Sequence, residues 1–208
     1  MNKLILVGGG GHAKVILSIL ERMTQWDILG YVSETRTDLH SPYLGTDDCL
    51  AALIQGYPQC QAVIAVGCVT VNTHRETIWN RLESQGFQLP AIISPHAFVA
   101  NDVSVGKGSI IMNGAIVQPG VTVGKGCILN THCTVEHDCK IEDFSHIASG
   151  ATLSGGVHIE RHTVVGAGSV IIQGIQVGSQ CVIGAGAVVV HDCKEKGTYV
   201  GVPARKIT

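Results

Sequence analysis

The chain has 208 residues, of which 45% are hydrophobic but only 4% aromatic, so it can bury a large core made of aliphatic side chains. Lys and Arg number 14 against 16 Asp and Glu, a formal net charge of −2, which predicts no basic face for nucleic acid. No apolar run reaches the roughly 18 residues of a membrane span, and the run at residues 4–7 is too short for a signal-peptide core. We therefore expect a cytoplasmic protein with no membrane span.

The first ninety residues alternate short apolar runs with amphipathic stretches. Strands are predicted at residues 4–7, 28–32 and 62–66, and helices at residues 15–23, 47–55 and 73–85. This β-α-β-α-β-α order predicts a small parallel sheet. We assign residues 1–92 to an α/β Rossmann-like domain, and Pro90 and Pro95 bracket the passage into the next domain.

A glycine-rich turn follows the first predicted strand. Gly8-x-Gly10-x-x-Ala13 matches the dinucleotide fingerprint, with Glu34 about twenty residues further on. Backbone N–H groups at such a helix N-terminus bind phosphate. Because ninety residues are too few for both halves of a dinucleotide fold, a sugar nucleotide with its diphosphate would meet the same need. The alternatives are a small NAD(P)-dependent enzyme and a turn that merely joins strand to helix.

Beyond residue 92 the sequence repeats every six residues. The repeated position is aliphatic throughout: Ile93, Val99, Val105, Ile111, Val117, Val123, Leu129, Val135, Ile141, Ile147, Leu153, Ile159, Val165, Ile171, Val177, Ile183 and Val189. The residue four places later is mostly small, and it is cysteine at positions 127, 133, 139, 181 and 193. Free cysteine packs as a small apolar side chain, so we expect both positions to face a core.

A period of six fits neither a helix nor a simple alternating strand. It fits a short strand followed by a corner, and glycine at several corners tolerates the required backbone angles. Three such sides close a triangular coil of 18 residues, and stacked coils pair as parallel strands. Residues 93–208 are therefore predicted to form an all-β coil domain with a C-terminal tail.

The eight cysteines predict neither disulfides nor a metal site. No secretion signal supports a disulfide framework, and cytosolic thiols stay reduced. No CxxC pair occurs, and no grouping of His, Cys and Asp has metal-ligand spacing. We expect no metal.

The repeat resembles that of the hexapeptide-repeat acyltransferases. The hexads 165–170 and 183–188 carry the likeness, together with the ending Gly201-Val202-Pro203-Ala204-Arg205. This resemblance implies a left-handed parallel β-helix, a homotrimer, and acyl-coenzyme A bound between neighbouring helices.

The two-part layout narrows the resemblance to the sialic acid O-acetyltransferase type. Its relatives include N-acetyltransferases of nucleotide-linked 4-amino-6-deoxy sugars, as in bacillosamine and perosamine pathways. The likeness covers essentially the whole chain and is most specific at residues 130–139 and 144–146.

The resemblance assigns the base of the reaction. His137 matches the general base of an E-H-[DE] triplet, and Asp138 matches the acid that raises its proton affinity. The chemistry independently favours this pair, because an attacking amine or hydroxyl must lose a proton and a carboxylate fixes the tautomer of the imidazole. The alternative is an ordinary exposed histidine.

Further residues match family positions. His146 matches a contact to acetyl-CoA near the thioester, Gly155 matches an N–H that stabilises the oxyanion, and Ala167 and Ala185 match main-chain contacts to the pantetheine arm. His146 could instead be a surface histidine, and the other three could be coil geometry alone.

The implied substrate-binding residues lie in the first domain. They are Gly10, Gly11, His12, Ser33, Glu34 and Gly67. Relatives commonly have an Asp pair where this chain has Ser33-Glu34, which puts the identity of the nucleotide in doubt.

Together these features predict acetyl transfer from acetyl-CoA to the amine of a nucleotide-linked 4-amino-6-deoxy sugar, in surface polysaccharide or glycan biosynthesis. No cysteine is predicted as a nucleophile. The nearest alternative is an O-acetyltransferase acting on sialic acid or another surface sugar, because the same base serves a hydroxyl. A non-catalytic scaffold coil is the other alternative, and it would not bind acyl-CoA.

Overall fold

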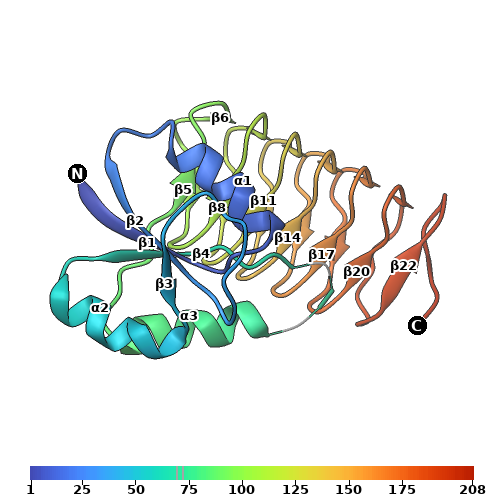
Figure 1. Ribbon diagram of the computed structural model, residues 1–208. Helices are drawn as coiled ribbons and strands as arrows, with labels where there is room; N and C mark the ends of the chain where they lie inside the picture. Colours follow the sequence, from blue (N-terminus) through green and yellow to red (C-terminus); the bar gives the residue numbers. More distant parts are fainter. Residues whose placement is uncertain (69, 72) are drawn as a thin grey trace.

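A computed structural model describes residues 1–68, 70–71 and 73–208. An α/β domain lies at one end, and a long β-helix runs from it to the C-terminus (Figure 1). No helix in the described ranges is long and apolar enough to cross a membrane. Both predicted architectures, the α/β domain and the β-helix, are confirmed.

The N-terminal domain is a parallel sheet with strand order β3-β2-β1-β4. Its elements are β1 (Asn2–Val7), α1 (Gly11–Leu20), β2 (Trp26–Val32), β3 (Tyr43–Gly45), a 3-10 turn (Asp47–Cys49), α2 (Leu50–Gly56), β4 (Gln61–Ile64) and α3 (His74–Ser84). Strands and helices occur where the sequence predicts them, with small shifts at their ends. Strand β3 was not predicted, because its three residues carry no alternation long enough to recognise.

The β-helix has three faces, each a stack of short parallel strands. The β14 face contains β5 (Ile92–Ile93), β8 (Ile110–Ile111), β11 (Ile128–Leu129), β14 (His146–Ile147), β17 (Val164–Val165), β20 (Val182–Ile183), β22 (Thr198–Val200) and the antiparallel β23 (Arg205–Lys206). The β12 face contains β6 (Phe98–Val99), β9 (Ile116–Val117), β12 (Thr134–Val135), β15 (Thr152–Leu153), β18 (Val170–Ile171) and β21 (Val188–Val189). The β13 face contains β7 (Ser104–Val105), β10 (Thr122–Val123), β13 (Lys140–Ile141), β16 (His158–Ile159) and β19 (Gln176–Val177).

The predicted 18-residue coil is confirmed by strand register. Thr122 pairs with Lys140, and Lys140 pairs with His158. The repeated aliphatic residues point inward, and most of them belong to one continuous buried cluster. The cysteines of the repeat lie in that cluster as predicted. Burial raises the pKa of the Cys127 and Cys133 thiols to about 12, so these thiols are poor nucleophiles.

At the corners between faces, one residue in every six has its backbone in the left-handed region. This residue is glycine at most corners, with φ between +63° and +75° at positions such as Gly108 and Gly120. His132, Asp138, Phe144, His162 and Gln180 take the same conformation with φ near +57°. A non-glycine residue in this region stores backbone strain, which is often found at functional sites. These five positions are therefore candidates for a role beyond the fold.

The N-terminal domain packs on the β14 face and on one neighbouring edge. Helix α1 shares a buried cluster with Ile92, Ile110 and Ile128, whose side chains point outward from that face. Helix α3 lies along the corners between the β13 and β14 faces, where Trp79 contacts Phe144 edge-on at 5.9 Å between ring centroids. The opposite edge, between the β12 and β13 faces, is therefore left free of the N-terminal domain (Figure 1). We call it the β12/β13 edge.

Candidate active site

A cavity of about 400 Å³ opens beyond the C-terminal ends of β1 and β2. Its lining includes the predicted Gly10, Ser33 and Glu34. Other residues around it are Val7, Gly8, Gly9, Val32, Thr35, Thr37, Asp47, Val66, His74, Ile78 and Arg81. Ligands bind at this end of parallel sheets in open α/β folds, so the cavity is a candidate nucleotide site.

The glycine turn shapes one wall of this cavity. Gly8 has φ +123°, and a Cβ there would lie 2.8 Å from the carbonyl carbon of Ala65, so the turn requires glycine at that position. Gly10 caps α1 with no side-chain hydrogen bond, and the first turn has no acidic residue. Both features leave backbone N–H groups and a positive helix end available for phosphate.

The structure brings the predicted His12, Gly67 and His146 into a second group where the two domains meet, with Gly67 exposed, His12 half-buried and His146 buried. A Cβ on Gly67 would lie 3.5 Å from the Cβ of His12. The Nδ1 of His146 lies 2.5 Å from the carbonyl oxygen of Cys68. The Nε2 of His12 is buried without a hydrogen-bond partner among the described residues, so the group holds one unused polar atom.

Both histidines of this group are held neutral. Burial, and then the nearby Arg75, lowers the pKa of His12 to about 3. Burial is also the largest cause that lowers the pKa of His146 to about 4, with Arg75 contributing. At neutral pH neither ring carries a charge.

The tautomer of His146 follows from its neighbours. The Oδ1 of Asn130 accepts the Thr131 N–H at 2.8 Å, so the amide group of Asn130 faces the other way. Its Nδ2 then donates to Nε2 of His146 at 3.1 Å. His146 therefore keeps its proton on Nδ1 and donates it to Cys68.

Arg75 was not identified from the sequence. It is buried and donates to the carbonyl oxygens of Val66 and, at 3.1 Å, of Gly126. One side chain thus ties the end of β4 to a corner of the β-helix. The sequence carries no signal for this role, because the acceptors are backbone carbonyls of two separate domains.

The predicted base lies elsewhere, on the β12/β13 edge. The Nδ1 of His137 lies 2.8 Å from Oδ2 of Asp138, and the two side chains are 66% and 73% exposed. A Cβ on Gly155 would lie 2.5 Å from Nε2 of His137, so glycine allows the backbone of the next coil to approach the ring. Gln173 and Gly174, not identified from the sequence, complete a cavity of about 320 Å³ with these residues.

This arrangement can accept a proton. Because the carboxylate of Asp138 is the partner of Nδ1, the free lone pair of His137 lies on Nε2, and that atom is beside Gly155 in the lining of the cavity. An attacking amine placed in the cavity could pass its proton to Nε2.

The residues predicted to contact acetyl-CoA do not meet in one chain. Gly155 lies on the β12/β13 edge beside His137. Ala167 and Ala185 lie on the edge between the β14 and β12 faces, one coil apart, where the Gly186 N–H donates to the Ala167 carbonyl at 2.9 Å. His146 is buried on the β14 face. Three separate places in one chain therefore carry these residues.

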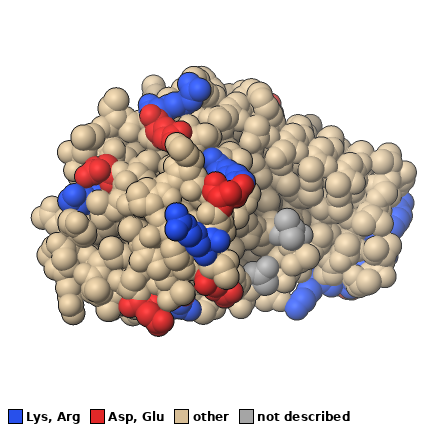
Figure 2. All heavy atoms as spheres, viewed as in Figure 1, with Lys and Arg blue, Asp and Glu red and all other residues tan. Residues whose placement is uncertain are grey.

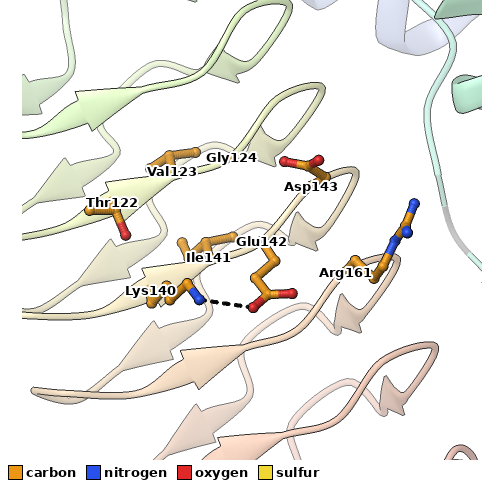
Figure 3. A pocket seen from close by; sticks show the side chains of 8 residues that line it. All are labelled: Thr122, Val123, Gly124, Lys140, Ile141, Glu142, Asp143 and Arg161. Carbon is orange, nitrogen blue, oxygen red and sulfur yellow. Dashed lines mark hydrogen bonds and ion pairs between the residues drawn. The ribbon is translucent and has the colours of Figure 1, made fainter. Parts of the chain in front are cut away.

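A further groove of about 400 Å³ runs along the β13 face (Figure 3). It is lined by Thr122, Val123, Gly124, Lys140, Ile141, Glu142, Asp143 and Arg161. Glu142 accepts from Lys140 at 3.0 Å, and His158 Nε2 lies 2.8 Å from the same carboxylate oxygen. The groove contains none of the predicted site residues, and its paired charges fit a solvated surface.

No group of three or more His, Cys, Asp or Glu in the described part of the chain could hold a metal ion. In the view of Figure 2, charges of both signs are interspersed over the N-terminal domain, while the visible later coils carry few.

Comparisons with known proteins agree with both domains. Residues 3–82 match the family model of the PglD N-terminal domain, and residues 102–137 and 138–173 match that of the bacterial transferase hexapeptide. Curated protein sequences give no significant match.

Solved structures resemble the whole chain. The acetyltransferase domain of PglB from Neisseria gonorrhoeae is 34% identical, covers 100% of both chains and has a TM-score of 0.91. PerB from Caulobacter crescentus, solved with CoA and GDP-perosamine, is 30% identical, covers 100% of this chain and 98% of its own, and has a TM-score of 0.92. WeeI from Acinetobacter baumannii, at 24% identity and TM-score 0.83, shares the fold.

With both family models matched and a 34% identical structure aligned end to end, the chain belongs to the PglD-type hexapeptide-repeat sugar N-acetyltransferases. It is an acetyl-CoA-dependent enzyme of that class.

Proposed function

We propose that this enzyme transfers an acetyl group from acetyl-CoA to the amine of a nucleotide-linked 4-amino-6-deoxy sugar, with His137 as general base. The observation that carries the proposal is the combination of a phosphate-type cavity with the exposed His137–Asp138 pair at 2.8 Å. PerB, solved with GDP-perosamine, supports this acceptor class.

In the proposed reaction the sugar amine attacks the carbonyl carbon of the thioester, and Nε2 of His137 takes the proton that the nitrogen loses. The oxyanion accepts a hydrogen bond from the Gly155 N–H. The C–S bond then breaks, and the departing thiolate takes the proton back from His137. The products are the N-acetyl sugar and free CoA, and no acyl-enzyme forms.

The position of His137 supports an active site shared between protomers. The cavity for the nucleotide belongs to the domain that covers the β14 face, whereas His137 lies on the β12/β13 edge opposite. A sugar held in the cavity of one protomer would therefore reach His137 of a neighbour. Such a contact would also bring Ala167 and Ala185 of one protomer toward Gly155 of the next.

The β12 face is the natural contact surface for a homotrimer. Its outward residues include Phe98, Ile116 and Val170, which are 56%, 37% and 36% exposed. The β13 face instead presents a polar row, in which Lys140 pairs with Glu142 (Figure 3). His158 in the next coil pairs with the same carboxylate. Burial of the apolar row against another copy would remove it from water.

The test is CoA release from acetyl-CoA with a panel of nucleotide-linked 4-amino-6-deoxy sugars and free sialic acid. We expect release with an amino sugar, and a loss of about 10²–10⁴-fold in His137→Ala while acetyl-CoA still binds. His191→Ala is the matched control, because His191 is an exposed histidine at the same position of a later coil on the same edge.

Release with sialic acid alone would replace this proposal with O-acetylation. Full turnover in His137→Ala would remove His137 from the mechanism.

A further inference from the structure

The β12/β13 edge carries one left-handed residue in each of four successive coils. Gly120, Asp138, Gly156 and Gly174 have φ of +75°, +60°, +68° and +71°. Three of them are glycine, which adopts this conformation without a steric cost. Asp138 is the exception, and its carboxylate is the partner of His137.

Gly120 differs from Gly156 and Gly174 because a side chain of the next coil lies against it. A Cβ on Gly120 would lie 2.5 Å from Oδ1 of Asp138 and 3.4 Å from its backbone nitrogen. A Cβ on Gly156 or Gly174 would meet nothing within 4 Å. Those two positions need glycine for backbone conformation alone, whereas Gly120 also leaves the space that the Asp138 carboxylate occupies.

The two carboxylate oxygens of Asp138 therefore have different neighbours. Oδ2 faces Nδ1 of His137 at 2.8 Å, and Oδ1 rests over the backbone of Gly120. Gly120 is itself anchored from the coil below, since its N–H donates to Oδ2 of Asp102 at 2.9 Å. The Asp138 N–H donates to the carbonyl of Pro119 at 3.1 Å, so the backbones of the two coils are tied together at this point.

The same construction occurs at other edges. A Cβ on Gly126 would lie 2.5 Å from the ring of Phe144, and one on Gly114 would lie 2.4 Å from the ring of His132. In this β-helix, the side chain of a non-glycine residue with positive φ can fold back over the residue 18 positions earlier. A bulky residue at that earlier position would displace the side chain.

We propose that Gly120 is a positioning residue for catalysis: its missing side chain sets where the Asp138 carboxylate lies, and so how His137 is held. The inference rests on the proposed role of His137 as base. Gly120 itself contacts no reacting atom.

The main test compares Gly120→Ala with Gly150→Ala. Gly150 has φ +67°, and a Cβ there would meet only the Gly168 nitrogen at 4.0 Å. Both variants pay a similar backbone strain, so we expect similar decreases in melting temperature. Only Gly120→Ala should lose kcat, by about 10- to 100-fold as expected for a misplaced catalytic group, with KM for both substrates within about twofold.

A double-mutant cycle separates positioning from general damage. Asp138→Asn removes the carboxylate charge, and Asn tolerates the left-handed conformation. If Gly120 acts only through Asp138, Gly120→Ala should cost nothing further in the Asp138→Asn background. Additive losses, or a Gly120→Ala variant as active as Gly150→Ala, would overturn the proposal.

Asp102→Ala provides a second variant should Gly120→Ala not fold. It frees the Gly120 N–H at an exposed position, and a fall in kcat that vanishes in the Asp138→Asn background is the expected result. An unchanged kcat would count against the proposal.

Failure of the proposed function is a distinct outcome, because it shows as undiminished turnover in His137→Ala itself.

Discussion

At the scale of single residues, chemically similar side chains are set apart by their surroundings. His137 is exposed and partnered by a carboxylate, while His146 is buried and partnered by a carbonyl and an amide. Only the first has an open nitrogen facing a cavity. The hexad position of His137, on a corner rather than in the aliphatic register, already indicated its exposure. The burial of His146 was not predicted, although the 18-residue period aligns it with Ile110 and Ile128, which are buried under the N-terminal domain.

The buried histidines make stability depend on pH. The folded-state pKa values of His146 and His12, about 4 and about 3, lie below the ordinary 6.5. The unfolded chain therefore binds more protons below pH 6.5, and the free energy of unfolding should fall as the pH drops from 6.5 toward 4. Each histidine contributes a slope of about 1.4 kcal/mol per pH unit in that range.

Urea denaturation between pH 7 and pH 5 measures this slope. His146→Gln keeps a donor for the Cys68 carbonyl but removes the titratable ring. The slope of unfolding free energy against pH should therefore fall by about half. An unaltered slope would show that His146 does not titrate on unfolding.

At the scale of elements, two arginine contacts hold α3 to the β-helix, and we expect them to contribute unequally to the free energy of unfolding. Arg75 is buried and donates to carbonyls of both domains. Arg161, half-exposed, pairs with Glu76 on α3 at 3.1 Å. Both arginines connect α3 to the β-helix, at coils nearly two turns of the β-helix apart, and they differ in burial and in the type of acceptor.

Arg75→Met and Arg161→Met should therefore differ in stability. Loss of Arg75 leaves buried carbonyls without donors, at about 1–3 kcal/mol for each, whereas an exposed ion pair contributes about 0–1 kcal/mol. Chemical denaturation followed by circular dichroism should show a large loss only in Arg75→Met. Equal losses would mean that burial does not decide the contribution of this contact.

At the scale of the whole molecule, a single chain separates the candidate nucleotide cavity from the proposed base. The N-terminal domain covers the β14 face, and His137 lies on the edge farthest from it. In the proposed assembly, a second copy supplies the other half of each site.

Complementation between two inactive variants tests this arrangement. Gly10→Asp places a carboxylate at the phosphate end of the cavity without a clash, since a Cβ on Gly10 meets nothing within 4 Å. Co-expressed with His137→Ala, it should restore activity, because statistical mixing gives about a quarter of the sites two intact halves. A mixture as inactive as its components would place the whole site within one protomer. Each variant expressed alone is the control.

Sequence by itself determined the coil, because a six-residue period with an aliphatic side chain at every repeat closes a core in only one register. It also located the glycine turn and the His137–Asp138 pair, because both depend on neighbouring residues. Only the tertiary structure decided the surroundings of His146 and the carbonyl partners of Arg75, since their partners lie 78 and 51 residues away along the chain. Contacts across such separations are set by how the two domains dock, and no local pattern records that docking.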